Sequence, residues 1–146
     1  MKISENGIRL IKEFEGLRLE AYLCSGNRWT IGWGTTQING TKVQAKDKID
    51  LEHAEELLKS DLNKFEDIVN SRIKPQITQN QFDALVSHTY NTGGSDTLFQ
   101  LINQKENKEK IRFWFENTYI TAKGKVIRGL VERRKKEADL FFLSDF

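Results

Sequence analysis

The hydrophobic period of this chain changes from strand-like to helical at Leu51, and this change limits the folds open to it. Residues 17–24 and 29–33 are strand-like and rich in aromatic side chains, and turn-forming residues 25–28 separate them. From Leu51 onward, apolar residues recur at helical spacing. We therefore expect an α+β fold, in which a small N-terminal β-hairpin lobe packs on a mostly helical lobe.

The expected helices have local start and stop signals. Ser4 is a suitable N-cap for a helix that ends near Gly16, and residues 51–69 carry one long apolar stripe. Thr78 opens a capping box, and the pair Gly93 and Gly94 ends the helix that follows it. Shorter helices are expected around residues 98–104, 108–118 and 130–142.

Length and composition indicate one domain. A chain of 146 residues is too short to divide into independent domains, so we expect a single domain over residues 1–146. Its β lobe would span about residues 16–50 and its helical lobe about residues 1–15 and 51–146. No uncharged apolar run approaches the ~18 residues of a membrane span, and the first residues do not resemble a secretory signal. We expect neither stable membrane insertion nor a signal peptide.

Charge and ligand spacing argue against two classes of partner. The formal net charge is only +2, which is too small to predict nucleic-acid binding, although residues 101–146 are basic. His53 and His88 have no partners at metal-ligand spacing, and the single Cys24 can form no intramolecular disulfide. We expect no nucleic acid partner, no metal and no other cofactor.

Three polar residues near the hairpin form a candidate catalytic set. Glu15 ends the first helix, and a hairpin would place Cys24 and Thr30 on facing strands. The nine steps from Glu15 to Cys24 can extend over roughly 30 Å, so the groups meet only if the strand curls back. A carboxylic acid opposite a thiol and a hydroxyl would suit inverting glycoside hydrolysis. Spacing alone favours the plainer interpretation, in which Glu15 is a solvated charge and Cys24 is a small buried apolar group.

Three ordered motifs resemble one family. Residues 15–22 followed by 29–35 closely resemble the active-site hairpin of phage-type lysozymes, glycoside hydrolase family 24. That family's pattern is Glu, eight residues, Asp or less often Cys, five residues, Thr, which here reads Glu15, Cys24 and Thr30. Residues 81–93 resemble its central helix, and residues 129–137 resemble its C-terminal Gly-Leu-x-x-Arg-Arg-x-x-Glu segment. The resemblance spans nearly the whole chain.

The resemblance implies a lysozyme-like fold and a muramidase activity. The substrate would be peptidoglycan, cleaved at the β-1,4 bond between N-acetylmuramic acid and N-acetylglucosamine. Glu15 would be the general acid, with Cys24 and Thr30 handling the water. Two residues depart from the family pattern: Cys24 replaces the commoner Asp, and His88 replaces an aromatic residue, which we expect to affect packing only.

The role of Cys24 stays open at this stage. A free thiol has a pKa of about 8.5, so a nearby cation is needed to make it mostly thiolate at neutral pH. Arg28, Arg133 or Arg134 could supply that charge. The thiol could act as a base for the water, merely position the water, or act as a covalent nucleophile. The family pattern favours base or positioner.

Several other aromatic and polar residues can be interpreted either as functional or as structural. Tyr90 and Asn91 are tentative substrate-binding residues, but Tyr90 suits a core position and Asn91 a helix C-cap equally well. Trp29 and Trp33 would share a strand face, where packing is favoured over stacking on sugars. Arg133 and Glu137 have the i,i+4 spacing of a surface ion pair.

Two alternative functions remain beside the muramidase. The main one is a catalytically inactive cell-wall-binding module on the same fold, and the other is a nucleic-acid-binding protein that uses residues 133–136. For the muramidase, the resemblance implies lysis of a host cell for a phage, although a bacterial or prophage origin fits equally. We expect a monomer that accumulates in the host cytoplasm before its release to the cell wall.

Overall fold

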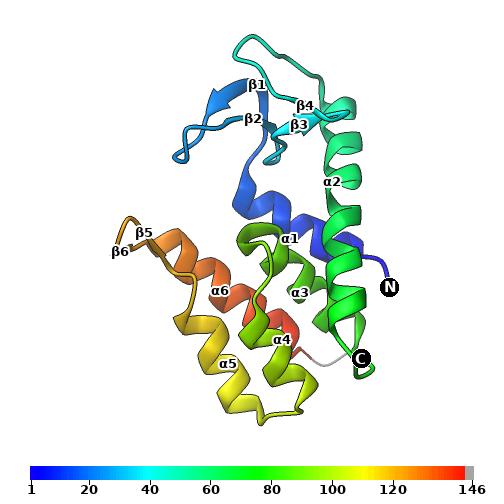
Figure 1. The fold of residues 1–146 in the computed structure, drawn as a ribbon, viewed down its shortest axis with the longest axis vertical. Helices are drawn as coiled ribbons and strands as arrows, with labels where there is room; N and C mark the ends of the chain where they lie inside the picture. The colour runs from blue at the N-terminus through cyan, green and yellow to red at the C-terminus, as the bar shows by residue number, and fades with distance from the viewer. Residues whose placement is uncertain (144–146) are drawn as a thin grey trace. The chain divides into compact units, whose positions relative to one another are not determined.

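The computed structural model describes residues 1–143 and contains helices and short antiparallel strands (Figure 1). The helices are α1 Glu5–Glu15, α2 Leu51–Arg72, α3 Gln79–Thr92, α4 Asp96–Asn103, α5 Lys108–Asn117 and α6 Arg128–Phe141. The strands are β1 Arg18–Leu23, β2 Trp29–Gly32, β3 Gln37–Ile38, β4 Thr41–Lys42, β5 Thr121–Ala122 and β6 Lys125–Val126. This arrangement confirms the predicted α+β class.

The strands form three separate antiparallel pairs, β1 with β2, β3 with β4, and β5 with β6. Only the first pair was predicted. The other four strands have two residues each, which is too short for a recognisable alternation of apolar and polar side chains. The described helices include none that is both long and apolar enough to cross a membrane.

The chain forms two compact units. One consists of Ile11–Lys64, and the other combines Met1–Leu10 with the chain from Phe65 onward. We call them the hairpin unit and the helical unit. The boundaries of the two units do not coincide with the ends of helices. Helices α1 and α2 each contribute residues to both units. The division into a β lobe at residues 16–50 and a helical remainder stays a prediction.

The core of the hairpin unit is built around strand β2. Ile31 is fully buried and Trp33 nearly so. Lys12 of α1 places its Nζ atom 4.4 Å from the centre of the Trp33 ring and 2.6 Å from Glu55 Oε1 of α2. A cation that contacts both a ring face and a carboxylate ties the end of α1 to the start of α2. This contact fixes the helix that leads into the hairpin.

Helix α3 is the central element of the helical unit. Thr78 and Gln81 form both hydrogen bonds of the predicted capping box. Gly93 ends the helix with φ of 87°, in the left-handed region that favours glycine. All side chains from Phe82 to Thr89 are buried, and α3 packs most extensively against α6. The polar residues of this buried stretch therefore need partners within the unit.

Candidate active site

The β1–β2 hairpin brings Cys24 and Thr30 together. In its register Tyr22 lies opposite Thr30. Cys24 follows directly after β1, where its N–H donates to the Arg28 carbonyl at 3.0 Å and its carbonyl accepts from Asn27 N–H at 2.9 Å. Asn27 has φ of 58°, which closes the turn tightly. The turn thus places the Cys24 thiol next to the Thr30 side chain.

The turn also stabilises the thiolate form of Cys24. The pKa of this partly exposed thiol lies below its ordinary value, first because backbone groups of Arg28 and Gly26 hydrogen-bond to the sulfur. The Thr30 side chain adds a third hydrogen bond, and the Arg28 charge contributes least. Hydrogen bonds to a charged form favour that form. Among the cations proposed for this role, Arg28 is the one that acts on Cys24.

The Thr30 hydroxyl has one proton, and two acceptors lie within its reach: the Arg28 carbonyl and the Cys24 sulfur. The side chain is buried, and its Oγ1 donates to the Arg28 carbonyl at 2.9 Å. A hydroxyl also accepts hydrogen bonds through two lone pairs. Thr30 can therefore accept from a water or a neutral thiol, and it can turn its proton toward a thiolate.

The Tyr22 phenol responds to the charges of both Cys24 and Glu15. The pKa of the Tyr22 phenol is raised, first by burial and then by the negative charges of Glu15 and Cys24, while Arg18 opposes the rise. Glu15 is the last residue of α1, and Gly16 at φ of 69° redirects the chain into β1. Both anionic groups thus lie within electrostatic range of one phenol. The sequence alone did not reveal this role of Tyr22, because it depends on the path of strand β1.

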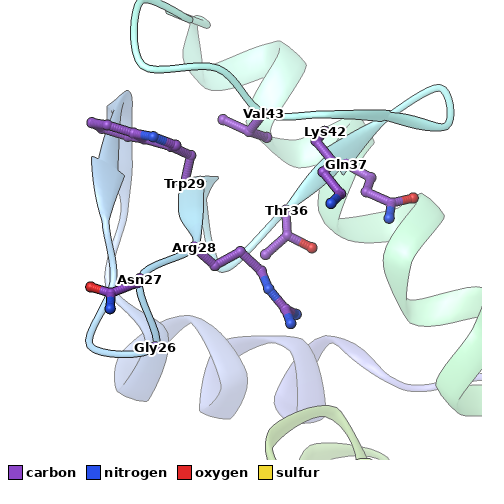
Figure 2. Close-up of a pocket in the computed structure, with 8 residues that line it drawn as sticks. All are labelled: Gly26, Asn27, Arg28, Trp29, Thr36, Gln37, Lys42 and Val43. Atoms are coloured by element: carbon purple, nitrogen blue, oxygen red, sulfur yellow. The ribbon is translucent and has the colours of Figure 1, made fainter.

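A pocket of about 480 Å³ opens beside Cys24. It is lined by Gly26, Asn27, Arg28, Trp29, Thr36, Gln37, Lys42 and Val43 (Figure 2). A Cβ atom added to Gly26 would lie 3.9 Å from the Cys24 sulfur, so the pocket lining begins next to the thiol. Sequence reasoning missed Gln37 and Lys42, because the two-residue strands that carry them gave no pattern.

The comparisons with known proteins decide the family. The phage lysozyme family model matches residues 12–137. The chain belongs to the phage lysozyme family. Its sequence is 40% identical to the endolysin of Bacillus phage PZA over 97% of this chain and 55% of that protein. It is 38% identical to the endolysin of Salmonella phage P22 over 97% of this chain and 98% of that protein.

Solved structures confirm the lysozyme fold. An endolysin from the Escherichia coli O157:H7 phage FAHEc1 matches with a TM-score of 0.82 at 40% identity, over 97% of this chain and 94% of that one. The muramidase domain of SpmX from Asticaccaulis excentricus matches with a TM-score of 0.84 at 32% identity, over 98% and 99% of the two chains. The chain spans about half, 55% and 56%, of the two Bacillus phage endolysins it matches, from phages PZA and B103.

The two tentative substrate-binding residues of this family member lie in the helical unit. The Tyr90 ring packs edge-on against Phe65, with 5.2 Å between ring centres. Asn91 is exposed, and its Oδ1 accepts a hydrogen bond from Arg134 Nη2 at 2.7 Å. The reading of Asn91 as the helix C-cap is wrong, because Gly93 occupies that position. Binding of substrate by Tyr90 and Asn91 stays a prediction.

His88, where this chain departs from the family pattern, does more than pack. It is fully buried with edge-on contacts to Trp114, Phe115 and Tyr119. Its Nδ1 lies 3.2 Å from Glu137 Oε1, and its Nε2 lies 2.7 Å from Ser95 Oγ. The expectation of a packing role alone is therefore wrong, since a residue chosen only for packing would need no polar partners.

Glu137 is the centre of this buried network. Ser87 Oγ donates to Glu137 Oε2 at 2.7 Å, and the Nε atoms of Arg133 and Arg134 lie 3.3 and 3.0 Å from its two oxygens. The predicted pair of Arg133 and Glu137 exists, but it is buried rather than on the surface, because α3 covers it. Within residues 1–143, no cluster of three or more His, Cys, Asp or Glu side chains could hold a metal ion.

Proposed function

We propose that this member of the phage lysozyme family is a muramidase. It would hydrolyse the β-1,4 bond between N-acetylmuramic acid and N-acetylglucosamine in peptidoglycan. The observations that support this most directly are that the Thr30 side chain adjoins Cys24 and that the charges of Glu15 and Cys24 both raise the pKa of Tyr22, all within one compact unit. The names of its relatives, which are endolysins and a muramidase domain, agree with this activity.

Each of the three residues has one role in the proposed reaction. The Cys24 thiolate removes a proton from a water that Thr30 holds, and the water oxygen bonds to the anomeric carbon of N-acetylmuramic acid. The bond from that carbon to the bridging oxygen breaks, and Glu15 gives its proton to the departing oxygen. Attack by water from the face opposite the leaving group inverts the anomeric configuration.

The surroundings of Cys24 support the role of base over that of positioner, and the inverting pattern of the resembled family favours base over nucleophile. Three hydrogen bonds and the Arg28 charge favour the thiolate, which is the form a base requires. A base is expected to contribute about 10² to 10⁴ in rate. We expect Cys24→Ser to lower kcat by that factor and Cys24→Asp, which restores an anionic base, to retain most of it. Equal activity of the Ser variant and the wild type would leave the thiol as a positioner only.

The biological setting is part of the same proposal. We propose that the protein acts as a monomer in the lysis of a host cell for a phage, and that it accumulates in the host cytoplasm before its release to the wall. The endolysin relatives support this setting. Fractionation of infected or expressing cells, with sedimentation of the purified protein, would test location and oligomeric state.

A wall-clearing assay separates the muramidase from an inactive wall-binding module. Purified peptidoglycan is incubated with the protein, and turbidity is followed while bound protein is measured by sedimentation. A muramidase lowers the turbidity and releases soluble fragments. Protein that sediments with the walls without clearing them, on several wall types, would favour the binding module.

A further inference from the structure

The pocket beside Cys24 is positively charged. Of its eight lining residues, Arg28 and Lys42 are basic and none is acidic. Within residues 1–143, neither Arg28 nor Lys42 forms an ion pair with a carboxylate. Two lysines of the hairpin unit do have such partners, since Lys12 pairs with Glu55 and Lys48 with Glu20. Two cations that pair with no carboxylate of the described residues, on a pocket without acidic side chains, favour an anionic ligand.

The remaining lining residues suit a ligand that has both polar and apolar parts. Trp29 is 37% exposed and lies on one side of the pocket, while Gln37 and Lys42 lie on the other (Figure 2). Aromatic side chains offer a flat apolar face, and the Gln37 amide and Thr36 hydroxyl offer donors and acceptors. A guanidinium binds a carboxylate through two parallel hydrogen bonds, so Arg28 can fix the orientation of such a group.

We propose that this pocket binds a free carboxylate of the peptide that substitutes N-acetylmuramic acid. This inference rests on the proposed function, because it assigns part of the same substrate to a second position. The glycan itself offers no charge where its lactyl groups are joined to peptide, so the peptide is the source of the anion. Because Gly26 adjoins both the thiol and the pocket, a bound peptide carboxylate would anchor the sugar near Cys24.

A binding experiment tests the pocket without relying on hydrolysis. The probe is the disaccharide of N-acetylglucosamine linked to N-acetylmuramic acid with its peptide, which lacks the bond that a muramidase cleaves. Its affinity is compared with that of the same disaccharide whose lactyl carboxyl carries an uncharged methylamide in place of the peptide, by calorimetry at low salt. Each exposed charge pair is expected to change affinity by about two- to fivefold. We therefore expect several-fold tighter binding of the peptide-bearing probe.

Two lysine variants make the test specific. Lys42→Gln removes a pocket cation, while Lys46→Gln removes an exposed cation of the same unit that does not line the pocket. We expect Lys42→Gln to weaken binding of the peptide-bearing probe about two- to fivefold, and Lys46→Gln to leave it unchanged. Arg28→Gln should weaken binding as well, but it also alters the electrostatics of Cys24. The test of the carboxylate site therefore depends on Lys42→Gln.

The outcomes are distinct from those of the clearing assay. Equal affinity for the two probes, or an equal loss in Lys42→Gln and Lys46→Gln, would overturn the carboxylate site. Methyl esterification of the peptide carboxylates should abolish the preference, and a preference that survives esterification would also overturn it. None of these results depends on wall clearing, so a muramidase without this pocket function remains recognisable.

Discussion

Cys24 and Thr30 lie in a turn whose backbone groups act on the sulfur as much as any side chain does. Sequence reasoning placed the two residues together because hairpin geometry is local, and the resemblance supplied their roles. It could not find the backbone donors at Gly26 and Arg28, since these depend on the conformation of the turn around Asn27. Tyr22 was not identified for a similar reason. Its proximity to two acidic groups depends on the path of strand β1, which the sequence does not specify.

The reactivity of Cys24 tests this local account. Because the pKa of the thiol is lowered, its alkylation by iodoacetamide should reach half of the maximal rate at a pH below that of an ordinary thiol, about 8.5. The protein has one cysteine, so the signal is unambiguous. Thr30→Val removes a hydrogen bond to the thiolate and should move the midpoint to higher pH.

The control for this titration is Thr41→Val, an exposed strand position of the same unit. It should leave the midpoint where the wild type has it. A wild-type midpoint at or above that of a free thiol would contradict the stabilised thiolate, and with it the role of base.

At the scale of elements, the helices could be predicted and most strands could not. Helix ends are encoded by neighbouring residues, as at Ser4, Thr78 and Gly93, and the structure confirms these positions. The pairs β3–β4 and β5–β6 depend on the turns between them rather than on side-chain alternation. For this reason the pocket, which the β3–β4 pair helps to line, had no signal in the sequence.

The capping box of α3 gives a prediction at this scale. Thr78→Ala removes the side chain that accepts from Gln81 N–H at 3.1 Å, and loss of an N-cap costs about 1 kcal/mol. We expect the free energy of unfolding, measured by urea denaturation, to fall by about that amount. Thr97→Ala, at an exposed position of α4, should change it by less than about 0.5 kcal/mol. Equal effects of the two substitutions would mean that the cap does not stabilise α3.

At the largest scale, the network around Glu137 connects α3 and α6 to Ser95, the residue that precedes α4. Sequence reasoning identified the spacing of Arg133 and Glu137 but placed the pair on the surface. The spacing of charged residues along one helix does not reveal that another helix covers them. The same network reaches Asn91 through Arg134, so it also orients one of the predicted substrate-binding residues.

Removal of the Glu137 carboxylate should destabilise the protein strongly. It would leave the buried Arg133 and Arg134 without their shared counter-charge, and breaking a buried ion pair costs about 3–5 kcal/mol. We expect Glu137→Ala to lower the free energy of unfolding by this amount. Glu132→Ala, which breaks the exposed pair with Arg128 on the same helix, should cost less than about 1 kcal/mol. Similar losses in both variants would contradict the central role of Glu137.

His88 should make stability depend on pH. Burial first, and then the charges of Arg134 and Arg133, lower its pKa below the unfolded value of about 6.5. Burial alone would raise the pKa of Glu137, but the His88 hydrogen bond and the two arginines hold it below its ordinary value. Both groups bind fewer protons when folded, so stability is present above their unfolded pKa values and is lost as the pH falls.

Thermal unfolding checks this sign. The wild-type Tm should fall between about pH 7 and pH 5, because the lowered pKa makes folded His88 take up less proton there than unfolded histidine does. His88→Gln keeps polar atoms but removes the titrating group, so its Tm should change less over the same range. A wild-type Tm that rises toward pH 5, or a variant with the same slope, would contradict the neutral buried His88.

The most direct test of the muramidase proposal is the chemical analysis of the new reducing ends that the protein releases from peptidoglycan. The wild type should produce N-acetylmuramic acid ends, and Glu15→Gln should lower their rate of formation by about 10² to 10⁴, as expected on loss of a general acid. Glu20→Gln, an exposed carboxylate on the neighbouring strand, should release them at the wild-type rate. Equal release by the wild type and Glu15→Gln, or new ends of N-acetylglucosamine instead, would contradict the account.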